Sequence, residues 1–467
     1  MSHFRSLLVR PVAILALATQ LAVAEQVSTV LTKVADLPVL GSGPYAASES
    51  PQSPRGGILQ IGNELWFTTN AGGAYTVGSI STYNLETGVF ELKHSFGLLD
   101  PLDPATAKHD GYAPFKTTLE LGNDGRIYYT TQWGGANWNG GTNGTLNNGG
   151  VVGSFDPATV QTTGVKVHWN GGAASPNPRS VMNGTIYVPR AGGEASLYAI
   201  TNAGGGEGAF GTVQKIDLDA SGNTAAVTQL TTFTSTNGKL PQGGLLYVDD
   251  PADAYYGNMY FATPSYKADG TINPTLQTFN INTNQVSVLY DDWDSLGVST
   301  SGFGYNTPVY DPLREVLYVV SLKDGIYQWD LQTSTASKLP NSGSGTVNDG
   351  GGNNFADPIL FGDSLYYVTQ TDEGYLYRYD LELQQVFKLY DLKDYDAFAS
   401  GQSGSLSVVV EDGIEYIYFL TGGKVNTTED NLGSLFRLQV SAIPEPSIAL
   451  LVAGTGVFFA LRRRRVS

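Results

Sequence analysis

The chain has 467 residues, contains no cysteine and carries a formal net charge of −17 at pH 7. The absence of cysteine excludes thiol catalysis, thiolate zinc sites and iron–sulfur clusters, and the acidic balance disfavours DNA, RNA and anionic lipid head groups as partners. With 57 glycines, 27 tyrosines and 15% charged residues, the composition is typical of an all-β protein.

The first two dozen residues predict export. Two arginines precede an apolar run over residues 12–23, and Ala22 and Ala24 fit the small-x-small rule for signal cleavage. We therefore expect residues 1–24 to be a signal peptide. The same pattern also suits a membrane anchor that stays attached.

Between residues 25 and 440 one unit recurs seven times, with drift. Each unit has an aromatic strand at the second arm of a hairpin, and the middle residues of these strands are Trp66, Tyr128, Tyr198, Tyr260, Tyr318, Tyr366 and Tyr418. A partner strand follows each one, over residues 79–84, 153–156, 212–217, 277–280, 325–330, 376–380 and 434–438. The recurrence predicts four-stranded units with loops of variable length.

Six of the seven partner strands end in an acidic or amide residue: Asn84, Asp156, Asp217, Asn280, Asp330 and Asp380. A short acceptor at the end of a strand can bond the backbone two residues further on. We interpret these residues as turn-forming and not as catalysts.

The repeat predicts the architecture. A hairpin cannot bury both of its faces, whereas sheets packed radially around an axis can. We therefore expect an all-β fold, a seven-bladed β-propeller, with six or eight blades as alternatives because the first and third units carry long insertions. The last unit supplies three strands before residue 441, and residues 27–35 read like a fourth strand. The two ends of the propeller segment should therefore complete one blade between them.

A glycine-rich motif follows the aromatic strand in the early units. It reads WFTTNAGG over residues 66–73, YYTTQWGG over 128–135 and YAITNAGG over 198–205. These segments resemble the glycine-rich tandem repeats called GloVer, which occur in bacterial surface proteins with diverse C-terminal anchors. Residues 318–325 read YVVSLKDG and depart from the motif. A double glycine suits a turn with positive φ and no room for a Cβ atom.

The histidines give little sign of catalysis. His94, His109 and His168 are the only ones in the predicted propeller, and none has metal-ligand spacing to another. The nearest candidate is His109, beside Asp110 in a long loop, which we interpret as a solvated loop residue. A catalytic role would need His109 or His168 to lie beside two acids at the propeller axis.

Two acidic clusters mark the ends of units, and they comprise Asp291, Asp292 and Asp294, and Asp391, Asp394 and Asp396. Closely spaced carboxylates in loops suit Ca²⁺, although neither cluster has EF-hand spacing. Solvated connecting loops are the alternative interpretation. Calcium is the one cofactor that the sequence suggests.

Two loop features bear on ligands. The glycine-rich loops over residues 133–150 and 341–354 lead into no predicted helix and lack the Lys and Ser/Thr of a P-loop, which disfavours nucleotide binding. Four tryptophans, Trp133, Trp138, Trp169 and Trp293, could stack on sugar rings. Packing of loops against blades is the alternative role for these side chains.

The C-terminal tail combines three signals. Pro444-Glu445-Pro446 is followed by an uncharged run over residues 447–461 and then by Arg462-Arg463-Arg464-Arg465. An apolar helix followed by cations is a stop-transfer signal. The run spans only about 22 Å as a helix, against roughly 30 Å of hydrocarbon, which suits a temporary anchor.

This tail resembles the PEP-CTERM sorting signal. The resemblance implies handling by exosortase, a membrane enzyme of Gram-negative bacteria that make exopolysaccharide, and transient anchoring in the inner membrane through residues 441–467. An ordinary tail anchor is the alternative.

Together these features predict an exported, surface-sorted propeller that acts as a binding or structural module of the cell envelope or extracellular matrix. A glycan or another envelope component is the expected partner, and a polar pocket at the ring axis is the expected ligand site. The alternative is a propeller-fold hydrolase or lyase acting on polysaccharide.

Overall fold

The computed structural model describes residues 27–38, 51–75, 77–97, 110–135, 149–172, 177–205, 210–234, 238, 240–264, 274–298, 306–321, 324–342, 356–369, 374–395, 404–422 and 433–442. Residues 31–437 form one compact unit, and the two chain ends form a second. The fold described below is that of residues 31–437, together with the short continuations of its first and last strands.

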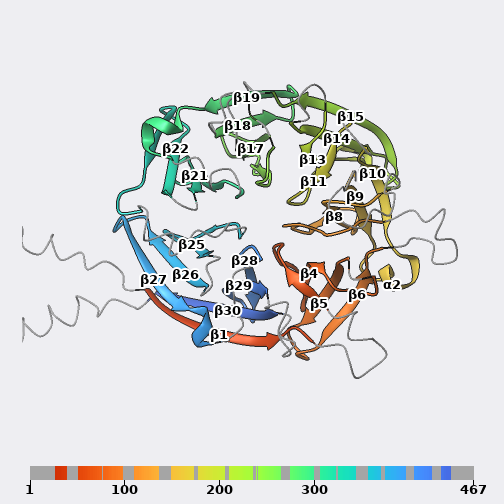
Figure 1. The fold of residues 1–467 in the computed structure, drawn as a ribbon, viewed down its shortest axis with the longest axis horizontal. Coiled ribbons are helices and arrows are strands. Elements are labelled where there is room, and N and C mark those ends of the chain that lie inside the picture. Colours follow the sequence, from red (N-terminus) through yellow and green to blue (C-terminus); the bar gives the residue numbers. More distant parts are fainter. Residues whose placement is uncertain are drawn as a thin grey trace, which may run out of the picture. The chain divides into compact units, whose positions relative to one another are not determined.

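Seven antiparallel sheets surround a central axis (Figure 1). We call them blades 1 to 7. Blade 1 holds β2 (Gln52–Pro54), β3 (Leu59–Ile61), β4 (Glu64–Ala71), β5 (Ser79–Asn84) and β6 (Phe90–Ser95); blade 2 holds β7 (Glu120–Leu121), β8 (Ile127–Thr131), β9 (Val151–Phe155) and β10 (Lys166–Asn170). Blade 3 holds β11 (Arg179–Val181), β12 (Ile186–Pro189), β13 (Ala195–Ala203), β14 (Thr212–Leu218) and β15 (Thr224–Thr232); blade 4 holds β16 (Leu246–Tyr247), β17 (Asn258–Thr263), β18 (Thr275–Asn280) and β19 (Gln285–Tyr290).

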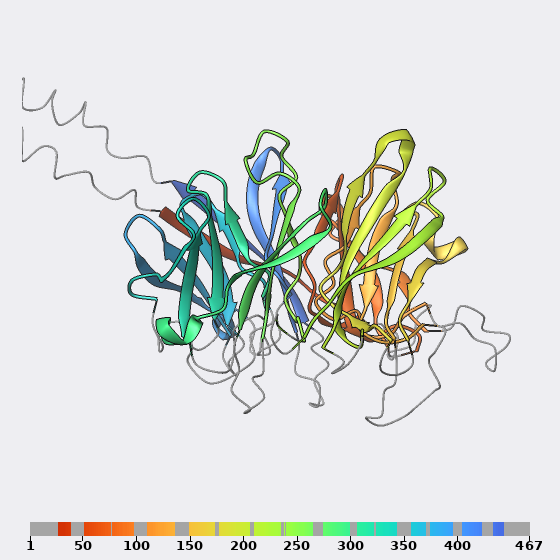
Figure 2. The same cartoon turned by 90° about the horizontal axis from the view of Figure 1, so that it is seen from above.

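The remaining blades continue around the ring. Blade 5 holds β20 (Val309–Asp311), β21 (Val316–Ser321), β22 (Gly325–Asp330) and β23 (Thr335–Lys338); blade 6 holds β24 (Ile359–Phe361), β25 (Ser364–Thr369), β26 (Tyr375–Asp380) and β27 (Gln385–Asp391). Blade 7 holds β28 (Ser407–Glu411), β29 (Ile414–Gly422), β30 (Gly433–Ala442) and β1 (Val27–Asp36). Seen from the side in Figure 2, the blades stand next to one another with their strands running between the two faces of the ring.

Helical structure is sparse in the described residues. It consists of α2 (Val160–Thr163) and the short 3₁₀ turns η2 (Ala191–Gly193), η3 (Trp293–Leu296) and η4 (Leu392–Asp394). None of these helices has the length and apolar character needed to cross a membrane.

The seven-bladed prediction is confirmed. Every predicted aromatic strand lies in the second strand position of its blade, namely in β4, β8, β13, β17, β21, β25 and β29. Every predicted partner strand lies in the third, namely in β5, β9, β14, β18, β22, β26 and β30. The repeat therefore gave both the strand type and its place in the blade.

The predicted closure is also confirmed. Strand β1 pairs with β30 and completes blade 7, in the order β1-β30-β29-β28 (Figure 1, red beside blue). Beside this pairing, the backbone N–H of Leu37 donates to the carbonyl of Gly433 at 2.8 Å, and Ser434 Oγ lies 2.8 Å from Asp36 Oδ1. The first strand thus completes the last blade and closes the ring.

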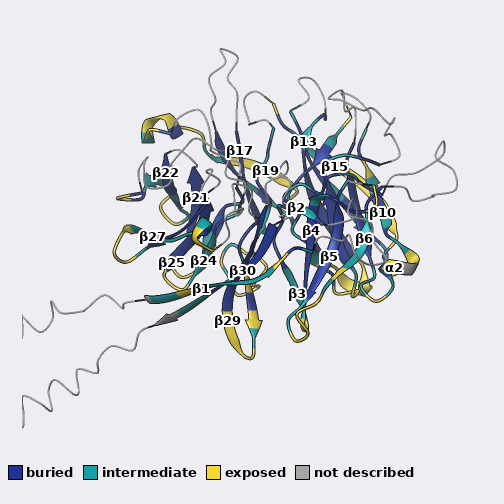
Figure 3. Cartoon of the chain, turned by 60° about the horizontal axis from the view of Figure 1, so that its bottom comes forward, coloured by how far each residue is buried: buried dark blue, intermediate teal, exposed yellow. Residues whose placement is uncertain are grey.

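The hydrophobic core lies in layers between neighbouring blades. Between blades 1 and 2, Trp66 packs on Phe155 with ring centroids 5.7 Å apart, and Tyr129 joins the same cluster. Between blades 7 and 1, Phe67 packs with Tyr418. Figure 3 shows the second and third strands buried and the connecting turns exposed. Full burial of one such side chain stabilises the fold by roughly 1.5–3 kcal/mol.

Five of the six strand-end residues form turns as predicted. Asn84 Oδ1 accepts hydrogen bonds from the backbone N–H groups of Glu86 and Thr87 at 3.0 and 2.9 Å. Equivalent backbone bonds are accepted by Asp156, Asn280, Asp330 and Asp380.

The interpretation was wrong for Asp217. Its carboxylate lies 3.1 Å from both Arg190 Nη1 and Lys215 Nζ, and it accepts from Ser196 Oγ at 2.6 Å. The turn acceptor in blade 3 is Asp219, which bonds the N–H groups of Ser221 and Asn223. The strand of blade 3 continues to Leu218, so the turn begins later than in the other blades.

The double glycines adopt the predicted conformation. The six glycines of the three early motifs have φ between 77° and 93°. At Gly204 a Cβ atom would lie 1.8 Å from the carbonyl oxygen of Asn177, so the turn also brings two backbones into close approach. The predicted signal peptide (residues 1–24), with Ala22 and Ala24, and the tail from Ile443 onward lie outside the described residues.

Candidate binding site at the propeller axis

Each blade begins with a three-residue segment at the axis. These segments lie just before β3, β7, β12, β16, β20, β24 and β28, and they are Arg55–Gly57, Lys116–Thr118, Asn183–Thr185, Gln242–Gly244, Asn306–Pro308, Ala356–Pro358 and Gly404–Leu406. We call them the axial ring. The first residue of the segment has a polar side chain in blades 1 to 5 and is alanine or glycine in blades 6 and 7.

Contacts between neighbouring blades hold the axial ring together. Blade 4 bonds blade 5 through the N–H of Gly244, which donates to Thr307 Oγ1 at 3.0 Å. Blade 6 bonds blade 7 through the N–H of Asp357, which donates to Ser405 Oγ at 3.2 Å. Blades 1 and 2 are so close that a Cβ atom on Gly56 would lie 1.9 Å from the carbonyl oxygen of Thr117. Only glycine fits there, because the two backbones touch.

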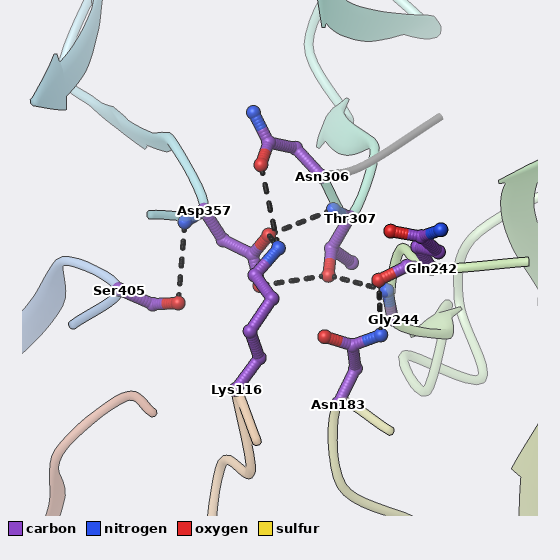
Figure 4. A network of polar contacts seen from close by, with 8 residues as sticks. All are labelled: Lys116, Asn183, Gln242, Gly244, Asn306, Thr307, Asp357 and Ser405. Atoms are coloured by element: carbon purple, nitrogen blue, oxygen red, sulfur yellow. Dashed lines mark hydrogen bonds and ion pairs between the residues drawn. The ribbon is translucent and has the colours of Figure 1, made fainter. Parts of the chain in front are cut away.

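Lys116 crosses the axis. Its side chain comes from blade 2, is completely buried, and places Nζ 3.4 Å from Asn306 Oδ1 and 3.3 Å from Asp357 Oδ1 (Figure 4). Burial lowers the pKa of Lys116, and the carboxylate of Asp357 opposes that shift. The ion pair therefore connects blade 2 with blades 5 and 6 on the far side of the ring.

Asp357 joins Lys116 to the backbone and side chain of Thr307. Its Oδ1 accepts from the backbone N–H of Thr307 at 2.9 Å, and its Oδ2 accepts from Thr307 Oγ1 at 2.9 Å. Both carboxylate oxygens are therefore engaged, and the charge is balanced by Lys116. Such a network fixes the relative rotation of the blades that it joins.

A cavity of about 370 Å³ lies at the axis beside this network. Its polar wall includes Thr118, Asn183, Thr185, Ser405 and Ser407, together with Glu120 and Tyr310. Its apolar wall includes Ile186, Leu245, Val309, Pro358 and Ile359. A concave, mixed lining of this volume is characteristic of small-molecule sites.

Asn183 has an unusual conformation and an unsatisfied atom. Its φ is 68°, in the left-handed region that asparagine tolerates better than most residues. Its Nδ2 donates to the carbonyl of Gln242, while its Oδ1 faces away from that bond (Figure 4). This Oδ1, like the hydroxyl of Thr185, is buried and has no hydrogen-bond partner among the described residues.

Two carboxyl groups of the described residues line the cavity, those of Asp357 and Glu120. Asp357 forms the ion pair with Lys116, whereas Glu120 does not take part in it. Burial raises the pKa of Glu120 to about 7, the carboxylate of Asp249 adds to the rise, and a backbone hydrogen bond from Tyr187 opposes it. Below neutral pH the side chain is therefore mostly uncharged and can donate a hydrogen bond.

Arg55 adds a second cation to the axial ring. Its guanidinium lies 4.8 Å from the ring centroid of Phe115, in the neighbouring blade. Burial lowers the pKa of Arg55 to about 10, which leaves the group charged at neutral pH. A cation over an aromatic face is an attractive arrangement.

The structure places neither of the two described histidines at the axis. His94 lies in β6, where its Nε2 is 2.5 Å from Asp110 Oδ2. His168 lies in β10, between Ser154 and Thr224. Burial lowers the pKa of His168 to about 3, with smaller contributions from two neighbouring cations. His109 lies outside the described residues.

The acidic clusters stay at the ends of blades 4 and 6. Asp291, Asp292 and Asp294 surround η3, while Asp391 and Asp394 surround η4, where Asp391 Oδ1 accepts from the N–H of Lys393. Asp396 lies outside the described residues. Within the described stretches, no group of three His, Cys, Asp or Glu side chains could hold a metal ion. Calcium binding stays a prediction.

The described tryptophans pack against aromatic neighbours. Trp293 is fully buried, with its ring centroid 4.8 Å from that of Tyr290. Trp133 packs against Tyr112 at 5.4 Å, and Trp169 joins a hydrophobic cluster of blades 2 and 3. Trp138 lies outside the described residues.

Sequence reasoning predicted a pocket at the axis but missed the residues that line it. The signal was present: in each unit a three-residue segment, mostly of polar or small residues, lies just before the strand that pairs with the aromatic strand, although its distance from the aromatic strand varies between units. It was hidden because its residues change type from unit to unit. Aligning the repeat on the strands makes the axial ring visible.

Solved structures resemble this chain only distantly. A structure of luciferin-regenerating enzyme is 12% identical with a TM-score of 0.36, and the alignment covers 70% of this chain and 92% of that one. A puromycin hydrolase structure is 10% identical with a TM-score of 0.37, over 80% of this chain and 59% of that one. A structural genomics protein of unknown function from Bacteroides thetaiotaomicron VPI-5482 is 12% identical with a TM-score of 0.40, over 89% of this chain and 77% of that one.

No protein-family model matches the chain, and no curated protein matches its sequence. The structural likenesses concern the fold alone. The resemblances of the tail to the PEP-CTERM signal and of the early units to GloVer repeats therefore stay predictions.

Proposed function

We propose that this chain is an exported, surface-sorted β-propeller that acts as a binding module of the cell envelope or extracellular matrix, with its ligand held at the axis. The observation that carries the proposal is the axial cavity of about 370 Å³ with its mixed polar and apolar lining. A ring whose seven blades meet at one such cavity offers one shared site.

Binding is tested with a glycan array and the purified full-length chain. The chain should bind one class of immobilised glycan. Leu245→Trp, which enlarges a side chain on the cavity wall, should abolish that binding. Leu313→Trp is the matched control, because Leu313 is 88% exposed and is not among the residues that line the cavity. Binding that survives Leu245→Trp unchanged would place the site elsewhere.

The sorting part of the proposal rests on the tail. Pro444, Glu445 and Pro446, the apolar run and the cations at Arg462–Arg465 support handling by an exosortase-type enzyme. Deleting residues 444–467 should release the protein to the periplasm or medium, as measured by cell fractionation. The melting temperature of the propeller should not change. Unaltered surface retention would contradict the sorting role.

One observation favours a second function, a propeller-fold hydrolase or lyase acting on polysaccharide. Glu120 lies on the cavity wall with its pKa raised to about 7, which suits a general acid or base. The measurement is release of reducing ends or unsaturated sugars from polysaccharides by the full-length chain. Activity that disappears in Glu120→Gln would establish this function, and no activity on a substrate that binds would favour the binding module.

A further inference from the structure

Two neighbouring residues that line the axial cavity each carry a buried polar atom without a hydrogen-bond partner among the described residues. Asn183 Oδ1 and Thr185 Oγ1 both come from blade 3, both residues line the cavity, and Thr185 is only 4% exposed. A buried polar atom without a partner is unfavourable, because it has lost its hydrogen bonds to water. Two of them in residues that line one cavity are the observation from which we infer that a ligand completes the site.

The chemistry of the two atoms restricts that partner. The NH₂ group of Asn183 must face the carbonyl of Gln242, because only a donor is compatible with a carbonyl oxygen, so Oδ1 is left as an acceptor. The hydroxyl of Thr185 can both donate and accept. The partner must therefore donate to Asn183, which a carboxylate or a phosphate dianion cannot do. A ligand hydroxyl can serve both atoms.

The charges of the site disfavour a cationic ligand. The carboxylate of Asp357 is already bonded to Lys116 and Thr307. A cationic ligand would therefore meet no unbalanced carboxylate there, and Glu120 is mostly neutral below pH 7. An ammonium group, which could also donate to Asn183, would be buried without a counter-charge.

The size of the cavity and its apolar wall restrict the class of ligand further. The cavity is near the lower end of the roughly 300–1,000 Å³ that ligand pockets span, so it suits one small molecule and not a length of polymer. Ile186, Leu245 and Pro358 supply apolar surface beside the polar atoms of blade 3. A pyranose ring presents the same combination, with hydroxyl groups at its edge and C–H groups on its faces.

We propose that the axial cavity binds a single neutral pyranose residue, whose hydroxyl groups donate to Asn183 Oδ1 and exchange hydrogen bonds with Thr185 Oγ1. The proposal deepens the binding function proposed above and rests on it. It names the ligand class, a neutral monosaccharide or the neutral end of a glycan, and the residues of the cavity that recognise it.

The test uses the full-length chain and methyl pyranosides of glucose, galactose, mannose and N-acetylglucosamine, titrated at pH 6 by isothermal calorimetry. Glucuronate and glucosamine serve as charged probes. At least one neutral pyranoside should bind, and its charged counterparts should bind at least tenfold more weakly. Stronger binding of a charged probe would overturn the proposal.

Two variants locate the site. Thr185→Val keeps the shape and removes the unpartnered hydroxyl, so it should fold as well as the parent and bind the pyranoside about tenfold more weakly. Asn183→Gly keeps the positive φ and removes the acceptor, with a similar loss. Thr185→Ser should restore binding. Thr263→Val, which removes a buried hydroxyl in blade 4 that bonds Thr275, should leave binding unchanged.

The outcomes separate this inference from the proposed function. If the array shows glycan binding but the Thr185 and Asn183 variants bind like the parent, the assignment of these residues is wrong and the binding function stands. If neither the array nor the titrations detect binding, both fail. Weakened binding in both variants, with Thr263→Val unaffected, supports both.

Discussion

The second strands of the blades are nearly alike, whereas the segments of the axial ring differ from blade to blade. Three positions after the middle aromatic residue, every second strand carries a buried hydroxyl: Thr69, Thr131, Thr201, Thr263, Ser321, Thr369 and Thr421. At the first position of the axial ring the residues are Arg55, Lys116, Asn183, Gln242, Asn306, Ala356 and Gly404.

The difference follows from what each position faces. A second strand packs between two neighbouring blades, so all seven meet nearly the same surroundings and need the same large side chains. The axial segments face one shared cavity and one another. If all seven carried a cation there, like charges would crowd at the axis; the mixture of cations, amides, a carboxylate and small residues avoids this. The positions that are alike in all seven second strands are therefore set by packing, whereas the positions of the axial ring that differ between blades are set by the shared cavity.

The largest expected effect comes from removing the closing strand. Deleting residues 27–36 leaves blade 7 with three strands and exposes the edge of β30, so the unfolding free energy should fall by several kcal/mol or the cooperative transition should disappear. Thermal unfolding followed by circular dichroism measures this. Val30→Lys is the control, because Val30 is 54% exposed on the same strand. An unchanged melting curve would mean that the ring does not depend on this pairing.

Lys116→Ala tests the axial ring, whose residues differ from blade to blade. It leaves the carboxylate of Asp357 buried without its cation, which should lower the unfolding free energy by about 3–5 kcal/mol. Urea denaturation checks the value. Lys33→Ala removes a more exposed ion pair with Asp36 and should cost less than about 1 kcal/mol.

A second variant separates charge from packing at the axis. In Lys116→Met combined with Asp357→Asn, neither charge of this ion pair remains buried, so the loss should be clearly smaller than in Lys116→Ala alone. Equal losses would show that the shape of the lysine side chain, and not its charge, holds the blades.

Leu365→Ala tests the second strands, whose residues are nearly alike in all blades. Leu365 is fully buried in the cluster between blades 5 and 6, and truncation should cost about 2–5 kcal/mol. Leu313→Ala, at a site 88% exposed, should change the unfolding free energy by less than about 0.5 kcal/mol. If both leucines behave alike in urea denaturation, the layered core between blades is not the main source of stability.

These regions also differ in how far the sequence predicts them. The aromatic triplets and their alternating partners gave the strands, the blade count and the closure by residues 27–35, because packing demands that they repeat. The pairing of Lys116 with Asp357, 241 residues away, has no local signal. It arises only when seven blades meet, so a sequence without that geometry in hand shows a lone lysine and a lone aspartate.

The same limit applies to the turn residues and the histidines. Asn84 and Asp380 could be predicted because their bonds are to neighbours two and three positions along the chain. Asp217 could not, because its partners Arg190 and Ser196 lie across the sheet. His168 is likewise held by Thr224 of the neighbouring blade.

Glu120→Gln sharpens the description of the cavity. The folded-state pKa of Glu120, about 7, lies above its ordinary value of 4.5, so the fold favours the neutral carboxyl. That contribution is fully present below about pH 4.5 and is lost as pH rises to about 7. The parent should therefore lose up to about 3 kcal/mol of unfolding free energy over this window relative to Glu120→Gln. Denaturant unfolding at several pH values measures the slope.

Glu415→Gln is the control for that slope, because Glu415 is exposed in β29 and is not among the residues that line the cavity. Its pH dependence should match that of the parent. A parallel pH dependence of the parent and Glu120→Gln would mean that Glu120 is as well solvated as an exposed glutamate.

The smallest expected effect separates the two kinds of strand end. Asn84→Ala removes an acceptor for two backbone N–H groups and should cost about 1 kcal/mol at any salt concentration, because neither bond depends on a net charge. Asp217→Asn weakens ion pairs with Arg190 and Lys215 and should cost a similar amount at low salt but much less in 1 M NaCl. Urea denaturation at both salt concentrations distinguishes them. If the two losses responded equally to salt, Asp217 would act as an ordinary turn residue after all, and the exception in blade 3 would lose its physical basis.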